Sequence, residues 1–140
     1  MGVPRFWREI PNRYNLIGMK CGFCNKVFFP PRFSCPVCRR KGTLEPYKLN
    51  KRGKIVTFSI THVAPNGFED QVPYAIAIIE LEEGPRLTAQ VTDCDPYRVK
   101  IGDEVEMVFR RIGQEGSDGP IYYGYKARLI GPYTLRANVK

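Results

Sequence analysis

The sequence predicts a mainly β protein with three successive parts: a short N-terminal helix, a metal-binding ribbon and a five-stranded barrel. Two Cys-x-x-Cys pairs near the N-terminus indicate the ribbon. Five segments of alternating apolar and polar residues beyond Gly53 indicate the barrel. A chain of 140 residues fits one domain, or a small domain with an accessory module. The expected boundaries are 1–20 for the helical segment, 21–48 for the ribbon, 53–130 for the barrel and 131–140 for a tail.

The distribution of charge supports a division into two modules. The chain carries a net charge of +8, but residues 1–52 hold 12 basic and 2 acidic side chains, whereas residues 53–130 hold 8 basic and 12 acidic ones. A basic head joined to an acidic body suggests different roles for the two parts. The polar, glycine-ended stretch 49–53 is therefore the expected junction.

The predicted helix covers residues 4–10. Pro4 suits a first helical turn, and Pro11 disfavours continuation of the helix beyond Ile10. Phe6, Trp7 and Ile10 form an apolar stripe. Two interpretations stay open, because this stripe can pack on its own domain or contact a partner.

The four cysteines of the two pairs, Cys21, Cys24, Cys35 and Cys38, are predicted to hold one metal ion. Each pair brings two thiolates from one tight turn, and together they complete a tetrahedral four-sulfur shell, for which zinc is the expected ion. Iron would fit the same ligands, and disulfides or redox chemistry are weaker alternatives. Asn25 and Gly42 are expected to adopt turn conformations beside the sulfurs, and residues 26–33 to form a short hairpin.

The ribbon contains more aromatic side chains than so small a module can bury. Phe23, Phe28, Phe29 and Phe33 all lie between residues 21 and 38, next to Arg32. Exposed aromatic groups with neighbouring arginine usually mark an interface. We therefore expect a partner or coenzyme A surface formed by Phe6, Trp7, Phe28, Phe29 and Arg32.

The second part is predicted to form a small Greek-key barrel of the OB type. Five antiparallel strands within about 80 residues, with a long loop after the third, suit this fold, and an SH3-like barrel is the nearest alternative. Inward positions are expected at Val56, Phe58 and Ile60, and at Val105, Met107 and Phe109. The expected strands are 56–62, 74–81, 87–92, 105–109 and 122–129.

Catalysis is not expected from these residues. His62 is the single histidine, and Cys94 lies between Asp93 and Asp95, whose charges would raise the pKa of the thiol. Single-stranded nucleic-acid binding is the alternative function, although the barrel is acidic and lacks the usual aromatic face. No apolar run is long enough to span a membrane, and the N-terminus has no secretory signal, so a cytoplasmic protein is expected.

The order of these elements resembles the family known as domain of unknown function 35. The resemblance spans nearly all of residues 4–130 and includes the segments 13–21, 29–32, 35–38 and 100–105. Members of this family, typically archaeal or bacterial, join a rubredoxin-like zinc ribbon to an OB fold. The family is linked to acyl-CoA metabolism.

The resemblance implies a non-catalytic adaptor rather than an enzyme. Its expected partners are an acetoacetyl-CoA thiolase and a hydroxymethylglutaryl-CoA synthase of the mevalonate pathway, which the small protein would bridge. One structural zinc ion is implied, together with a share in binding coenzyme A. The tail 131–140 falls outside the resemblance.

Overall fold

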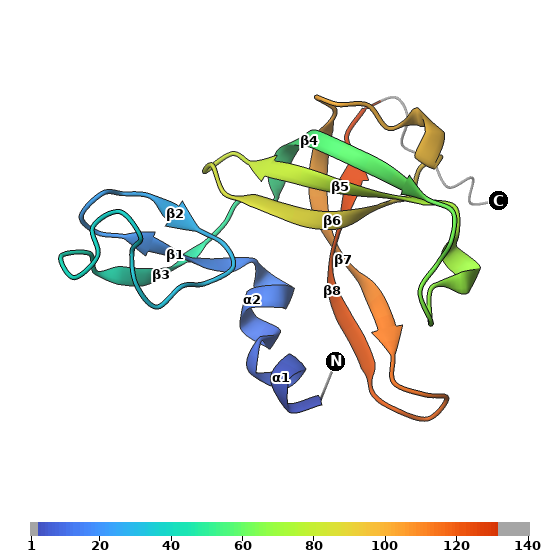
Figure 1. Cartoon of the computed structure of the whole chain (residues 1–140), viewed down its shortest axis with the longest axis horizontal. Helices are drawn as coiled ribbons and strands as arrows, with labels where there is room; N and C mark the ends of the chain where they lie inside the picture. Colours follow the sequence, from blue (N-terminus) through green and yellow to red (C-terminus); the bar gives the residue numbers. More distant parts are fainter. Residues whose placement is uncertain (1–2, 132–140) are drawn as a thin grey trace.

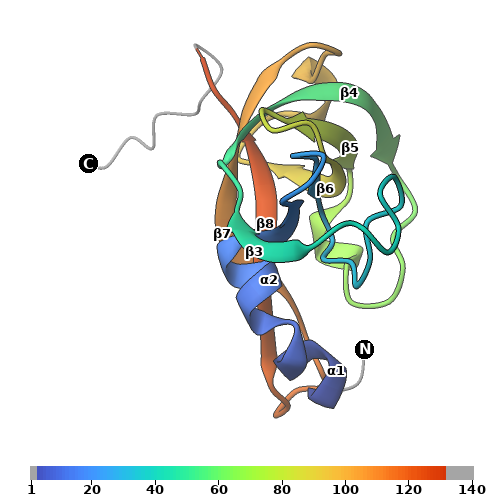
Figure 2. The same ribbon diagram turned by 90° about the vertical axis from the view of Figure 1, so that its left-hand side faces the viewer.

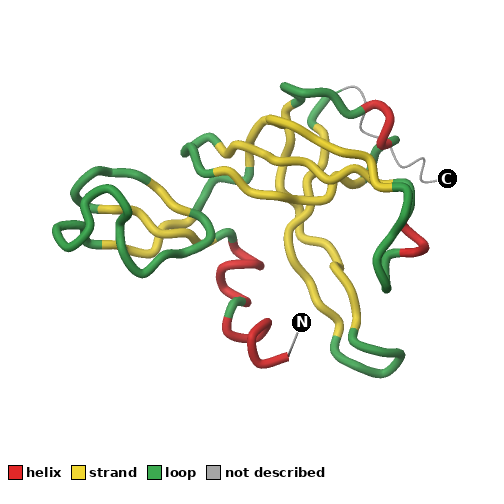
Figure 3. Tube along the Cα trace, viewed as in Figure 1, coloured by secondary structure: helices red, strands yellow, loops and turns green. Residues whose placement is uncertain are grey.

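The computed structural model describes residues 3–131, and residues 132–140 of the predicted tail lie outside the described part. A small three-stranded sheet and a larger barrel lie side by side, and two short helices run below the junction between them (Figure 1). Strands account for most of the regular structure (Figure 3). The prediction of a mainly β fold with a ribbon and a five-stranded barrel is confirmed.

The N-terminal segment forms two helices, α1 (Val3–Arg8) and α2 (Ile10–Asn15), where the sequence predicted one. The break lies at Glu9, and Pro11 occupies the first turn of α2. The expectation that Pro11 ends a helix is therefore wrong, because a proline in a first turn lacks only an N–H that has no helical partner there. Leu16 ends α2 in the left-handed conformation, with φ of 52°, and is buried.

The ribbon is a three-stranded antiparallel sheet in which β1 (Ile17–Cys21) lies between β2 (Val27–Phe28) and β3 (Leu44–Lys48). The hairpin predicted within residues 26–33 is wrong, since β2 pairs back onto β1 with Met19 opposite Phe28. Pro30 and Pro31 have no N–H to donate, so the chain beyond Phe29 does not return as a paired strand. The third strand, β3, was not predicted.

The five barrel strands are joined in the order β4, β5, β6, β8, β7, with β7 closing back onto β4. All neighbouring pairs are antiparallel except β6 and β8, which run parallel. This strand order agrees with the predicted Greek-key barrel. The strands are β4 (Arg52–Thr61), β5 (Tyr74–Leu81), β6 (Arg86–Thr92), β7 (Glu104–Gln114) and β8 (Ile121–Leu129), with one-turn helices at Glu69–Gln71 and Pro96–Arg98.

Barrel closure depends on a close backbone approach at Gly53. This residue pairs with Leu81 on β5 and with Val105 on β7. A Cβ atom built there would lie 2.6 Å from the Glu80 carbonyl oxygen, so a larger residue would push the strands apart. The glycine that marks the junction in the sequence is thus part of the closure.

The ribbon and the barrel share one hydrophobic core. Leu16, Phe29 and Leu49 from the head belong to the same buried cluster as the barrel residues Ile55 and Ile79. The Leu49 N–H also donates to the Leu16 carbonyl at 3.0 Å. The view in Figure 2 places α2 alongside β7 and β8, as the contacts between α2 and β8 require. The head is therefore packed onto the barrel rather than loosely tethered.

Two of the predicted inward positions, Val56 and Phe109, differ in the structure. A bulge between Ile55 and Thr57 places Ile55 in the core and leaves Val56 half-buried. Phe109 is 50% exposed instead of buried. In Figure 1 the ends of β7 and β8 extend beyond the barrel as a hairpin arm. Phe109 is paired with Tyr125 on β8, and its ring lies 5.0 Å from that of Tyr14 on α2 and 5.3 Å from that of Tyr123.

Within residues 3–131, neither α1 nor α2 has the length and apolar character that a membrane-crossing helix requires.

Candidate functional site

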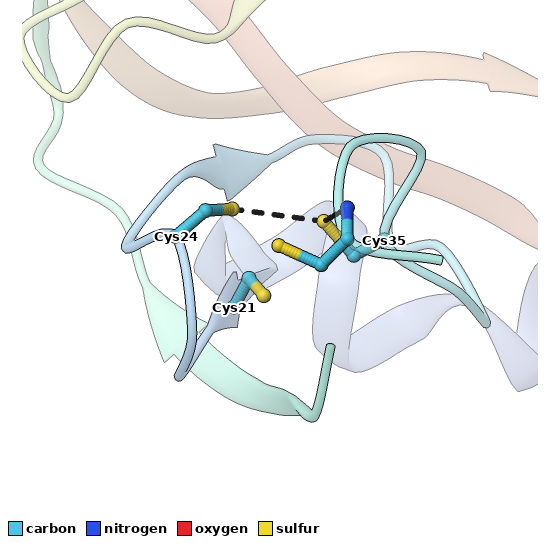
Figure 4. Close-up of side chains that lie close together, drawn as sticks. Cys21, Cys24 and Cys35 are labelled. Carbon is cyan, nitrogen blue, oxygen red and sulfur yellow. Dashed lines mark hydrogen bonds between the residues drawn. The ribbon is translucent and has the colours of Figure 1, made fainter. Parts of the chain in front are cut away.

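The four predicted metal ligands meet at the end of the ribbon. Their sulfur atoms all lie within 4.8 Å of one another, and the Sγ atoms of Cys24 and Cys35 are 3.6 Å apart (Figure 4). Ligands at the zinc–sulfur distance in a tetrahedron lie about 3.8 Å apart, whereas a disulfide needs about 2.0 Å. All four are free thiols, so the geometry fits a four-thiolate metal site and not a pair of disulfides.

Each cysteine pair sits on a tight turn that ends in a left-handed residue. Asn25 has φ of 58° and its N–H donates to the Cys21 carbonyl at 2.9 Å. Arg39 has φ of 52° and its backbone N–H donates to the Cys35 carbonyl at 2.8 Å. The Cys38 N–H also reaches the Cys35 sulfur at 3.4 Å. The turn prediction for Asn25 is confirmed, and its counterpart in the second pair is Arg39 rather than Gly42.

Gly42 serves the site in another way. A Cβ atom at this position would lie 2.7 Å from the Cβ of Cys35 and 3.1 Å from the sulfur of Cys21. Only a hydrogen side chain therefore lets residue 42 pass so close to the sulfurs.

The surroundings favour thiolate formation unequally within the cluster. The backbone N–H of Cys24 donates to Cys21 and lowers the pKa of its thiol to about 7, the largest effect there. Burial raises the pKa of Cys38 to about 12, and the neighbouring sulfurs add to the rise. Four thiolates in this space need a bound cation to offset their charge.

The structure separates the five residues predicted for a partner or coenzyme A surface. Phe6 is 7% exposed, with its ring 4.6 Å from that of Tyr122. Phe29 is 9% exposed and packs in the shared core. The exposure expected of these two is wrong, because the barrel supplies the cover that the ribbon lacks.

The other three residues remain accessible. Trp7 is 70% exposed on α1, Phe28 is half-buried, and the exposed Arg32 guanidinium lies 5.6 Å from the centre of the Phe28 ring. Phe23 and Phe33 are also exposed, and the prediction omitted them from the site. Their position in the loops that carry the cysteines was the available signal, since those loops wrap a metal site rather than a core.

A hollow of about 730 Å³ lies where α2, the loop 29–33 and the barrel meet. Its lining includes Arg13 and Arg32 from the head and Lys126 from β8. Sequence reasoning missed this feature. Lys126 occupies an outward position on β8, which predicts a solvated side chain, yet it is only 7% exposed.

The groups considered for catalysis are not assembled into a site. His62 is exposed just beyond β4. Burial raises the pKa of the half-buried Cys94 thiol, and the charges of Asp95, Asp93 and Asp103 raise it further. A thiol held in its protonated form is a poor nucleophile, as the sequence predicted for Cys94.

Comparisons with known proteins match both parts of the chain. The family model described as "ChsH2, rubredoxin-like zinc ribbon domain" matches residues 8–45, and "ChsH2, C-terminal OB-fold domain" matches residues 47–110. A "DUF35 domain-containing scaffold protein" of Methanothermobacter thermautotrophicus is 55% identical over 122 residues, which cover 87% of this chain and 92% of the relative. One with the same description from Methanocaldococcus jannaschii is 56% identical over 128 residues, 91% of either chain.

A solved structure described as "Ltp2-ChsH2(DUF35) aldolase" has a similar fold. It superposes with a TM-score of 0.68 at 24% identity and covers 92% of this chain and 96% of its own. At this identity the likeness concerns the fold alone. The two family models and the two scaffold relatives identify the chain as a member of the DUF35 family, with a rubredoxin-like zinc ribbon and an OB-fold barrel.

Proposed function

We propose that the chain is a non-catalytic zinc-binding scaffold in acyl-CoA metabolism. In this proposal it bridges an acetoacetyl-CoA thiolase and a hydroxymethylglutaryl-CoA synthase of the mevalonate pathway. The two relatives described as scaffold proteins support the general role. The two enzyme partners come from the family resemblance, and co-purification tests them. A reducing cytoplasm is the proposed compartment, since the cysteine cluster requires free thiols.

The metal in this proposal is one structural zinc ion held by Cys21, Cys24, Cys35 and Cys38. Four protein ligands complete its coordination and leave no position for a substrate or water. Zinc would tie the turn after β1 to the loop before β3. Residues 21–38 have little apolar core of their own, so the ion would replace core packing as the source of their stability.

The observation that carries the scaffold proposal is the exposure of aromatic side chains on two separate elements. Trp7 is exposed on α1, and Phe23 and Phe33 are exposed in the cysteine loops of the ribbon. The ribbon also carries the half-buried Phe28 with Arg32 over its ring, and these four ribbon residues are called the ribbon patch. In Figure 1, α1 and the end of the ribbon point in different directions from the barrel. Aromatic and arginine side chains are the usual anchors of interfaces, and two such patches suit a protein that holds two partners.

Coenzyme A contact is proposed for the ribbon patch. Arg32 is exposed and stacks on Phe28, which holds the guanidinium over the ring while its N–H groups stay free to face a phosphate. Arginine recognises phosphate through paired charge-assisted hydrogen bonds, and an aromatic ring can cover an adenine. The ligand would then be shared with a partner enzyme.

Co-purification tests the bridge directly. The thiolase and the synthase from the source organism are combined with and without this chain, and their association is followed by size-exclusion chromatography with light scattering. We expect a particle containing all three proteins when the chain is present and separate enzymes when it is absent. Stable association of the two enzymes without the chain, or no association with it, would contradict the proposal.

Single-stranded nucleic-acid binding is the second candidate, and the surface of β6 argues against it. The outward residues there are Thr88, Gln90 and Thr92, which offer neither rings for base stacking nor positive charge. The basic residues of the head would still attract any polyanion at low salt.

We therefore expect weak and strongly salt-dependent binding to oligothymidylate. Affinity measured by fluorescence anisotropy at about 50 mM salt should be nearly lost at about 200 mM, because charge contacts alone would carry it. An oligonucleotide of different sequence should behave in the same way. Tight binding that survives the higher salt would favour the nucleic-acid function instead.

A further inference from the structure

The hollow between the head and the barrel has the volume and the lining residues of a small-molecule site. Its volume of about 730 Å³ lies in the usual range for ligand pockets. Met19 and Phe33 of the head line it together with Ile112, Tyr123 and Tyr125 of the hairpin arm and barrel. These apolar and aromatic surfaces come from elements far apart in the sequence, so only the packed chain forms the hollow.

A buried lysine, Lys126, lines the same hollow. Lys126 and Gln90 also line a second hollow of about 250 Å³, to which Gln71 belongs. Lys126 is 7% exposed, and its Nζ donates to Gln71 Oε1 at 3.3 Å. Gln90 Nε2 donates to that same oxygen at 3.0 Å. Within residues 3–131, Lys126 forms no ion pair, and its polar partner is therefore a neutral amide that it shares with another donor.

The nearby charges do not compensate this lysine. Asp93 is the acidic group whose charge favours the protonated form of Lys126. Its carboxylate, however, is paired with Arg110 at 2.9 Å. Burial lowers the pKa of Lys126, the charge of Arg110 lowers it further, and Asp93 opposes the change. A buried cation without a counterion is costly to the folded state, and a bound anion would offset that cost.

The head adds further positive charge to the lining. Arg13 of α2 and the exposed Arg32 belong to the lining, against a single acidic residue, Glu9. The carboxylate of Glu9 accepts a hydrogen bond from Asn12 Nδ2 at 2.7 Å. The hollow thus combines an apolar wall with an excess of cations.

We propose that this hollow binds an apolar carboxylic acid, with its carboxylate on the Lys126 ammonium and its hydrocarbon chain along the aromatic wall. A single carboxylate matches the charge of a single buried ammonium. The chain would pass the rings of Tyr123 and Tyr125 toward the loop 29–33. This site goes beyond the scaffold role, since it gives the scaffold a ligand of its own.

The test uses octanoate as the probe and isothermal titration calorimetry on the full chain. We expect octanoate to bind the wild-type protein and to bind Lys126→Met about tenfold more weakly, as for the loss of one charge-assisted hydrogen bond. Methionine keeps the length and apolar stem of the side chain. The matched control is Lys100→Met, an exposed lysine outside the lining, which should bind octanoate as the wild type does.

Two further ligands distinguish the chemistry. Octanol, which has the chain without the charge, should bind more weakly than octanoate to the wild type and equally to the wild type and Lys126→Met. Coenzyme A without an acyl chain tests the phosphate contact proposed for Arg32. Binding of coenzyme A without binding of octanoate would overturn the carboxylic-acid proposal and leave the scaffold function standing.

A measurement on the wild-type protein keeps the proposal testable if Lys126→Met does not fold. Octanoate added to ¹⁵N-labelled protein should shift the amide signals of Gln90, Gly124 and Lys126, which line the hollow. Shifts confined to other residues would contradict the proposed site. Equal octanoate affinity of folded Lys126→Met and wild type would assign Lys126 to anchoring Gln71 and reject its role in ligand binding.

Discussion

Cys35→Ser is expected to abolish stoichiometric zinc binding and to unfold the ribbon. Cys35 is 1% exposed, and its sulfur lies 3.6 Å from that of Cys24, so serine would remove one of four ligands from a closed shell. Structural zinc contributes about 10–16 kcal/mol in small zinc domains, far more than residues 21–38 could recover by packing. Metal analysis should give about one zinc per wild-type chain and much less in the variant.

The fifth cysteine provides the matched control. Cys94 lies in the barrel outside the cluster, so Cys94→Ser should retain one zinc per chain. The barrel of Cys35→Ser should still unfold cooperatively, at a lower temperature because Phe29 no longer completes the shared core. A wild-type protein that is folded but free of metal would contradict the structural-zinc assignment, and one iron per chain would change the identity of the ion.

Trp7→Ala is expected to weaken binding to the thiolase-like partner by roughly thirtyfold. This ratio corresponds to about 2 kcal/mol, the usual cost of truncating a central aromatic anchor. Trp7 is 70% exposed on α1, so its removal takes little from the core of the isolated chain. Surface plasmon resonance with the immobilised partner measures the effect, and zinc content and melting temperature should stay close to the wild-type values.

Ile101→Ala is the control for loss of exposed apolar surface in general. Ile101 is 69% exposed in the loop before β7, so its truncation should leave the affinity unchanged. If Trp7→Ala keeps its affinity for the partner but lowers the melting temperature, α1 is a structural support and the interface lies elsewhere. Equal losses of affinity in both variants would also contradict a specific role for Trp7.

Trp7 is exposed and Phe6 is buried, a difference within the predicted docking surface that the sequence could not predict. Both belong to one apolar stripe, and the sequence left open whether that stripe faces a partner or the chain itself. The hairpin arm decides, because it brings Tyr122 against Phe6 and leaves Trp7 uncovered. Since the arm lies more than 100 residues further along the chain, no local pattern could separate the two rings.

Local chemistry in the sequence was enough to predict the metal cluster and the barrel type. Two Cys-x-x-Cys turns converge because each turn sets the direction of its own thiols, and alternation of apolar residues defines a strand without reference to its neighbours. Whether Phe29, Phe109 and Lys126 are buried or exposed depended on contacts between distant segments. The barrel covers Phe29, the projecting arm exposes Phe109, and the packing around Gln71 and Gln90 buries Lys126. Burial is a property of the assembled chain, so only the tertiary structure could decide which of these side chains meet solvent, a partner or a ligand.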